Sequence, residues 1–200
     1  LSIAKDGRAS LYMLLHQAAV LATHSLDVRA RLMELSYLEG LGALVSQRDG
    51  EAEVVAQACE VAVALAICGG PAVQAFIPPF VAGWTKHIAL SAMHLSCLKA
   101  ADAIVSRAHS CTAEILGQSG GCKAIALGMR EHPDMMDIQA LSCSLILKLC
   151  TFAPTNVEQF GTAPDLIEAC LLPIVQSPNS EAWAACIDCI KVLAQDGDVS

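Results

Sequence analysis

Charged and aromatic residues are both scarce in this 200-residue chain. Asp, Glu, Lys and Arg together make up 16% of it and aromatic residues make up 4%, whereas charged residues alone reach about 25% in ordinary soluble domains. Apolar residues account for 54%, so the chain is hydrophobic enough to build a core, and disorder is excluded. The few charges leave little polar surface for a free-standing monomer, so we expect neighbouring chain or other subunits to cover part of the surface.

Basic residues are the minority among the charges. Twelve Lys and Arg against 20 Asp and Glu give a net charge of −8. This sign opposes binding to nucleic acid phosphates or to anionic lipid, so we expect no nucleic-acid partner. The start of the chain has no Met and no basic region before an apolar run, so no signal peptide is visible. We therefore expect a segment of a longer chain or a subunit of a larger complex.

The cysteines are too few for a disulfide-rich secreted scaffold. Most of them sit inside apolar runs, where cysteine behaves as a small hydrophobic residue. We interpret them as reduced thiols, which indicates a cytoplasmic or other reducing compartment. The ten are Cys59, Cys68, Cys97, Cys111, Cys122, Cys143, Cys150, Cys170, Cys186 and Cys189.

One stretch is long enough to test for a membrane span. Residues 61–85 carry no charge, and a run of this length can cross a bilayer. However, Gly69-Gly70-Pro71 and Pro78-Pro79 interrupt it, and proline removes backbone donors that hydrocarbon would not replace. Two buried helices explain the run better, and a membrane-complex subunit is kept as an alternative.

The chain also lacks the alternating apolar pattern of strands, and its apolar residues recur at helical spacing. Four expected helices align on one internal cysteine, namely Cys59, Cys97, Cys143 and Cys186, which are 38, 46 and 43 residues apart. Leu15 occupies the same position 44 residues before Cys59. This repetition predicts an all-α protein built from repeated units. The aligned helices cover Val54–Ala66, Met93–Val105, Asp137–Cys150 and Ala182–Ala194.

A shorter pattern lies between these helices, a short helix and then a medium one, as at 28–50, 111–134 and 157–179. A period near 42 residues with such helices resembles the armadillo repeat, with the HEAT repeat as the fallback. The sharpest match is GGCKAIALGMREHPDMMDIQALSCSLILKL at 120–149, with its Gly-Gly start, His-Pro-Asp and buried cysteine. The resemblance implies one domain over 1–200, a right-handed α-solenoid of four to five repeats. The expected repeats are 10–24 (partial), 26–67, 70–108, 111–152 and 155–195.

The third repeat departs from the pattern, because Pro78-Pro79 fall where its first two helices should be joined by a turn. In an armadillo-like stack the last helix of each repeat lines a concave groove, and the resemblance implies that this groove binds an extended peptide or a helix of a protein partner. Positions three before, one after and five after the cysteine position should face the groove. The candidate residues are Tyr12, His16, Glu60, His94, Leu98, Asp102, Ser144, Lys148, Trp183, Ile187 and Lys191.

Trp183 is the favoured partner anchor, because tryptophan is enriched at the energetic centres of interfaces, with packing into the core as the alternative. The groove positions show no repeated Trp and Asn, which nuclear-import adaptors of the armadillo family use to hold basic peptides. We therefore expect a different class of partner.

Catalytic and cofactor motifs are weak. Cys186 and Cys189 form a C-x-x-C within an expected helix, and no second pair stands nearby in sequence. We interpret the pair as structural and retain a metal- or thiol-dependent protein as an alternative. No nucleotide-binding loop or nucleophile elbow is present in the sequence, so the sequence predicts a non-catalytic interaction scaffold without a cofactor.

Overall fold

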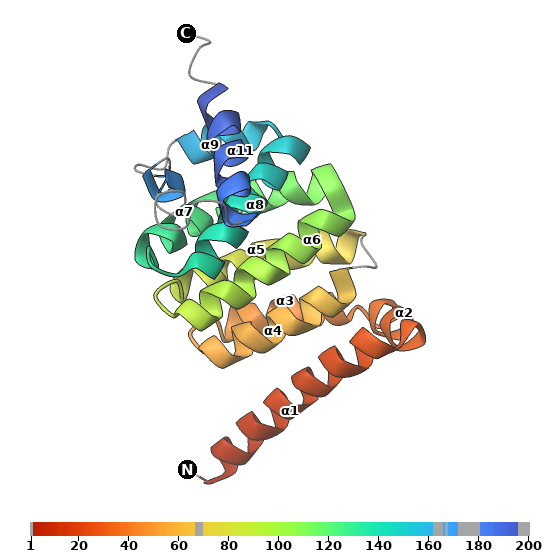
Figure 1. The fold of residues 1–200 in the computed structure, drawn as a ribbon. Coiled ribbons are helices and arrows are strands. Elements are labelled where there is room, and N and C mark those ends of the chain that lie inside the picture. The colour runs from red at the N-terminus through yellow and green to blue at the C-terminus, as the bar shows by residue number, and fades with distance from the viewer. Residues whose placement is uncertain (1, 67–69, 162–165, 167, 172–180, 196–200) are drawn as a thin grey trace.

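The computed structural model describes residues 2–66, 70–161, 166, 168–171 and 181–195. Helices account for all the regular structure within these ranges, and no strand occurs in them. The all-α class is therefore confirmed. Figure 1 shows the helices stacked from α1 at one end of the molecule toward α11 at the other.

Three helices open the chain: α1 (Ser2–His24), α2 (Leu26–Glu34) and α3 (Tyr37–Gln47). The Oγ of Ser25 accepts a hydrogen bond of 3.3 Å from the backbone N–H of Val28, so it caps α2 directly after α1 ends. The side chains of α2 are partly or fully exposed, whereas Leu38, Leu41 and Val45 of α3 are buried.

Next come α4 (Ala52–Leu65) and α5 (Pro71–Lys86). The predicted turn at Pro78-Pro79 is wrong, because both prolines lie inside α5. Each proline removes a backbone donor from the helix, and packing compensates. The ring of Pro79 lies 3.2 Å from the place where a Cβ on Gly42 would stand, so the glycine of α3 allows close contact with the proline of α5.

The longest helix is α6 (Ser91–Gln118). It runs without a break through the boundary expected between the repeats at 70–108 and 111–152, so the short helix expected from residue 111 is its continuation. No proline or glycine stands between Ser91 and Leu116, and nothing in the local sequence therefore ends the helix earlier.

The remaining helices are α7 (Gly121–Glu131), α8 (Met136–Phe152), α9 (Thr155–Gly161) and α11 (Glu181–Gln195), with a helical segment at 168–171 before α11. Gly120 precedes α7 with a φ of 93°, a left-handed conformation that a residue with a side chain adopts only at a cost.

The helices contact one another in two rows (Figure 1). In one row α4 packs against α1 and α6, and α8 packs against α6 and α11. In the other row α5 packs against α3 and α7, and α7 packs against α9. Contacts of α5 with α4 and α6, and of α7 with α6 and α8, join the two rows. Along the sequence, the chain therefore alternates between the rows: after a helix of one row it passes through the other row before it forms the next helix of the first.

The predicted burial of the four aligned cysteines is confirmed. Cys59, Cys97, Cys143 and Cys186 are each at most 1% exposed. Leu15, placed at the same position in α1, is also buried. The sequence alignment therefore finds the side of these helices that faces the interior.

No helix among the described residues is both long enough and apolar enough to cross a membrane. Within the 61–85 stretch, α4 ends at Leu65 and α5 begins at Pro71. Val73, Phe76, Ile77 and Phe80 of α5 are buried in the protein core.

Candidate functional site: the face of the long helices

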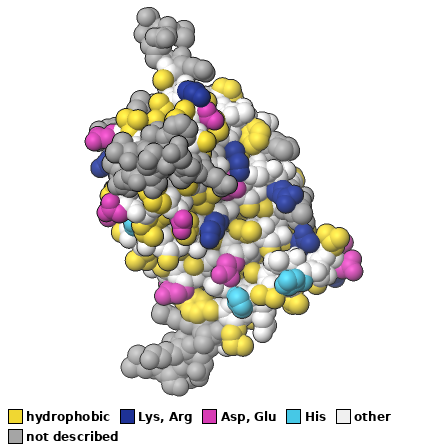
Figure 2. All heavy atoms as spheres, in the orientation of Figure 1, with side chains coloured by type: hydrophobic (Ala, Val, Ile, Leu, Met, Phe, Trp, Pro, Cys, Tyr) yellow, Lys and Arg dark blue, Asp and Glu magenta, His cyan; other side chains and the backbone are white. Residues whose placement is uncertain are grey.

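The row formed by α1, α4, α6, α8 and α11 presents a surface that we call the long-helix face. Two hollows lie on it. The first, of about 480 Å³, lies over α1, α4 and α6, and the second, of about 520 Å³, lies over α6, α8 and α11. Lys99 of α6 lines both hollows, so it stands between them. In Figure 2, drawn in the orientation of Figure 1, charged and histidine side chains are interspersed with hydrophobic ones.

Two pairs of predicted groove residues meet across neighbouring helices of this face. His16 Nδ1 of α1 lies 3.4 Å from Glu60 Oε2 of α4, with both side chains at least half exposed. Lys148 Nζ of α8 donates to Asp102 Oδ1 of α6 at 2.5 Å and to Ser106 Oγ at 3.0 Å. The members of each ion pair occupy the same aligned position in successive helices, so the predicted positions do lie side by side.

Other predicted groove residues are also placed at the surface. Tyr12 donates a hydrogen bond of 3.2 Å to Glu51 Oε2, Ser144 lines the second hollow, and Ile187 is partly buried on α11. Lys191 is exposed and pairs with Asp188 on its own helix at 2.9 Å. The side chain of Trp183 falls outside the described residues, so its choice as anchor stays a prediction.

His94 and Leu98 were wrongly assigned to the groove, because both are fully buried. The accessible side of α6 passes through Ser96, Lys99 and Asp102, so of the three positions predicted on this helix only Asp102 lies on it. Cys97 and Leu98 are both buried, and the exposed residue beside them is Lys99. The central place of α6, which packs against α4, α5 and α8, buries the side that carries His94.

His94 is instead the centre of a buried aromatic group. Its Nδ1 accepts a hydrogen bond of 2.8 Å from Trp84 Nε1, and its Nε2 is buried with no hydrogen-bond partner among the described residues. Burial, and after it the nearby His132, together lower the pKa of His94 to about 4. The neutral ring, with its proton on Nε2, is the form that accepts from Trp84.

The alignment missed Lys99 and Leu95, which line the hollows. The sequence does contain a signal for Lys99, because it is the one charged residue in the stretch 95–101. A charged side chain within an apolar helical stretch indicates the exposed side of the helix.

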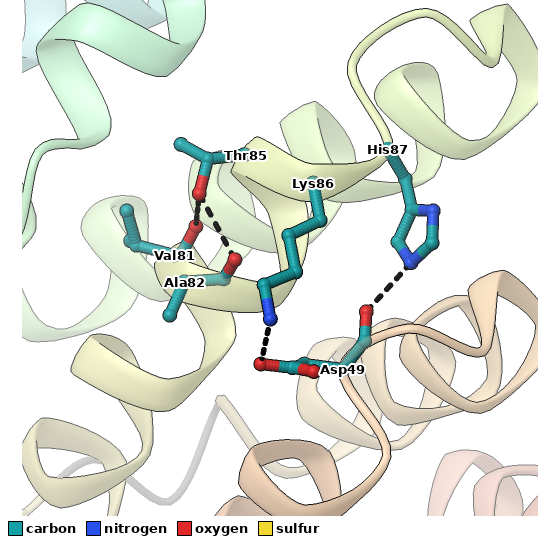
Figure 3. A network of polar contacts seen from close by, with 6 residues as sticks. All are labelled: Asp49, Val81, Ala82, Thr85, Lys86 and His87. Atoms are coloured by element: carbon teal, nitrogen blue, oxygen red, sulfur yellow. Dashed lines mark hydrogen bonds and ion pairs between the residues drawn. The ribbon is translucent and has the colours of Figure 1, made fainter.

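Polar contacts between the ends of successive helices hold the other row together (Figure 3). Lys86 at the end of α5 pairs with the carboxylate of Asp49, and His87 Nε2 donates to the backbone oxygen of Asp49 at 2.7 Å. His132 at the end of α7 repeats the second contact, since its Nε2 donates to the backbone oxygen of Ile88 at 2.6 Å. Each histidine thus fastens one turn to the equivalent turn before it.

A second candidate site is a buried group of four thiols, which we call the thiol cluster: Cys143, Cys170, Cys186 and Cys189. The sulfur atoms of Cys143, Cys170 and Cys189 all lie within 4.8 Å of one another. The sulfur of Cys186 lies 2.8 Å from that of Cys143. The C-x-x-C pair of α11 therefore does have partners, which come from α8 and from the 168–171 segment.

Hydrogen bonds within the thiol cluster shift its acidity. The hydrogen bond with Cys143, and then the one with Cys189, lower the pKa of Cys170 to about 4, because they stabilise its thiolate against the opposing effect of burial. The hydrogen bonds that Cys143 makes, first with Cys170, raise the pKa of Cys143. Cys170 is thus the member that most readily holds negative charge.

No family model, curated protein or solved structure matches the chain. Its function is therefore inferred from the long-helix face and the thiol cluster.

Proposed function

We propose that the chain is a non-catalytic scaffold, a right-handed armadillo-type α-solenoid that binds a protein partner along the long-helix face. The bound element is an extended peptide or a helix, because the two hollows follow one another along a row of parallel-stacked helices rather than closing into one pocket. Lys99 between the hollows is the observation that carries the proposal.

Contacts between aligned residues support the repeat architecture. His16 and Glu60 are 44 residues apart, and Asp102 and Lys148 are 46 residues apart. Both separations in sequence are close to the repeat length of about 42 residues that the sequence analysis predicts. Contacts at one repeat length between equivalent positions are typical of stacked units that touch only their neighbours.

The composition of the hollows supports a polypeptide as the occupant. The first is lined by Val20 and Val63 together with Glu60 and Lys99, and the second by apolar side chains with Asp137 and Ser144. Apolar surface with a few polar groups at its edge is typical of protein interfaces. Lys99 is exposed and forms no ion pair with another described residue, so its charge is available to a carboxylate of the partner.

A peptide-display selection tests this function. Binders selected on the wild-type chain should lose at least about tenfold in affinity with Lys99→Glu, a loss equivalent to about 1.4 kcal/mol. Lys123→Glu is the matched control, because Lys123 is exposed on α7 in the other row and the change in charge is the same. Equal affinity for the wild type and Lys99→Glu, or equal loss in both variants, would contradict the proposal.

The proposed compartment is cytoplasmic or otherwise reducing. The nine described cysteines are all free, and eight of them are buried. Free thiols in the interior are typical of proteins kept in reducing surroundings. The acidic balance of the chain, −8, supports a protein partner rather than nucleic acid.

A further surface near the start of the described chain favours assembly. A groove of about 630 Å³ lies among α1, α2 and α3, and Leu14, Leu21 and Leu35 line it although each is more than half exposed. Apolar patches of this kind mark contact surfaces. We expect the isolated chain to self-associate in sedimentation velocity experiments. Leu14→Glu combined with Leu21→Glu should reduce this association, whereas Leu90→Glu, at another exposed leucine, should not.

A further inference from the structure

The four thiols of the thiol cluster come from three separate segments of the chain. Cys143 lies in the middle of α8, Cys170 in the 168–171 helical segment, and Cys186 and Cys189 three residues apart on α11. All four are fully buried. Residues three apart on a helix share one face, so α11 presents both of its thiols to the same neighbours.

The rest of the core shows what ordinary packing of cysteine looks like in this protein. Cys59 of α4 and Cys97 of α6 are buried with their sulfur atoms 3.6 Å apart. That contact is one pair across one helix interface. In the thiol cluster, three sulfur atoms from α8, α11 and the intervening segment lie within 4.8 Å of one another, and the sulfur of Cys186 contacts that of Cys143. A pair at one interface does not account for this arrangement.

We infer that the thiol cluster is a zinc site in which Cys143, Cys170, Cys186 and Cys189 supply four thiolate ligands. Four cysteines are a standard ligand set for structural zinc, and thiolates also select zinc over magnesium and calcium. In tetrahedral coordination with Zn–S bonds of about 2.3 Å, two sulfur atoms stand about 3.8 Å apart.

The geometry of the cluster is close to this arrangement. The sulfur atoms of Cys170 and Cys189 are 3.8 Å apart, and Cys143 lies within 4.8 Å of both. Cys186 is the member that must adjust, because its sulfur lies 2.8 Å from that of Cys143. Its sulfur does not lie within 4.8 Å of all three of the others, so the side chain must also move toward the point that those three sulfur atoms surround to complete the tetrahedron. Zinc binding displaces the thiol protons as the thiolate ligands form.

The ion would fasten α11 and the 168–171 segment to α8. It would therefore hold the last long helix on the stack, beside the second hollow, which Ala185 of α11 helps to line. This role is structural and is independent of the proposed partner binding, so either proposal can fail while the other stands.

Metal analysis of the full chain tests the site. Chain purified in reducing buffer without added metal should contain about one zinc ion per molecule. Apo-protein titrated with Co²⁺ should develop thiolate-to-cobalt charge-transfer absorption and the intense visible bands of a tetrahedral site. Zinc-free protein that gives no such absorption with Co²⁺ would overturn the proposal, as would a Cys143–Cys186 disulfide found by mass spectrometry in the zinc-free chain.

Variants then locate the ion. Cys170→Ser combined with Cys189→Ser should abolish the cobalt absorption, whereas Cys59→Ser combined with Cys97→Ser removes a buried pair elsewhere and should retain it. Equal loss in both would contradict the assignment. A measurement on the wild type avoids any folding defect: after a chelator is added, Cys170 and Cys189 should be alkylated faster while Cys59 and Cys97 are unchanged. An unchanged alkylation rate at all four cysteines would also contradict the site.

Discussion

Two buried groups with polar atoms lie in the core of this protein, and they differ in how far packing explains them. The aromatic group of Trp84, His94 and His132 joins α5, α6 and α7 through one hydrogen bond and ring contacts, with ring centroids 5.5 Å apart for Trp84 and His94. The thiol cluster joins α8, α11 and the segment between them through sulfur alone. Packing and hydrogen bonding explain the aromatic group as part of the core, whereas we infer that the thiol cluster is a set of zinc ligands.

The side chains around the two groups support the same distinction. The ring of His94 fills the space beside Gly128 so closely that a Cβ there would stand 1.9 Å from its Cε1. Shape therefore fixes the histidine in one place. The thiols are small and three of them meet around a common point, which is the arrangement that a metal ion requires.

The largest expected loss of stability comes from a substitution that disrupts the aromatic group. Gly128→Ala places a methyl group against the ring of buried His94, and we expect at least about 3 kcal/mol of lost stability from this overpacking. Chemical denaturation measures it. Gly40→Ala is the control, because nothing lies within 4 Å of a Cβ there and α3 should gain slightly from alanine. Similar stabilities for the two variants would contradict the close packing of His94.

Lowering the pH should destabilise the folded chain through His94 of the same aromatic group. The pKa of His94 is about 4 in the folded chain and about 6.5 when unfolded. Between these values the unfolded chain binds the proton more readily, so stability falls as pH drops from 6.5 to 4, by about 3 kcal/mol in total. Denaturation at several pH values should show a smaller loss for His94→Leu than for the wild type. His24→Leu, at an exposed histidine, should behave as the wild type does.

Removing the N–H donor of Trp84 should lower the stability by a smaller amount. Trp84→Phe leaves Nδ1 of His94 buried without its hydrogen bond, which should cost about 2 kcal/mol. The ring contact with Phe80, at 5.7 Å between centroids, remains available to the new side chain. A change below about 0.5 kcal/mol in the free energy of unfolding would show that the hydrogen bond is not formed.

The smallest expected change in stability concerns the thiol cluster. In excess chelator, Cys143→Ala and Cys97→Ala should each cost about 1 kcal/mol, since each removes one buried sulfur atom. With zinc present, the loss should grow for Cys143→Ala alone. Thermal unfolding with and without chelator measures the difference, and an equal response of the two variants would show that Cys143 is an ordinary core residue.

Local patterns predicted several helices well. The helices expected at 54–66, 137–150 and 182–194 agree with α4, α8 and α11 to within two residues. Their apolar residues recur at helical spacing over several turns, so each helix is specified by its own sequence. His16 with Glu60, and Asp102 with Lys148, were predicted only to face the groove, and the structure brings each pair into contact.

Features that depend on distant contacts were not predictable in the same way. Pro79 of α5 packs close to Gly42 of α3, and the burial of His94 depends on Trp84 and Gly128. The thiol cluster required Cys143 and Cys170 to approach Cys186 and Cys189. No spacing within one helix reveals such a meeting, because it is set by how the helices stack.

Hydrogen exchange on the chain with a selected peptide bound locates the binding surface. We expect the peptide to slow exchange in α4, α6 and α8 around the two hollows, and we expect Lys99→Glu to remove this protection while Lys123→Glu keeps it. Protection confined to α3, α5 and α7 would place the binding surface on the other row and contradict the assignment of the long-helix face.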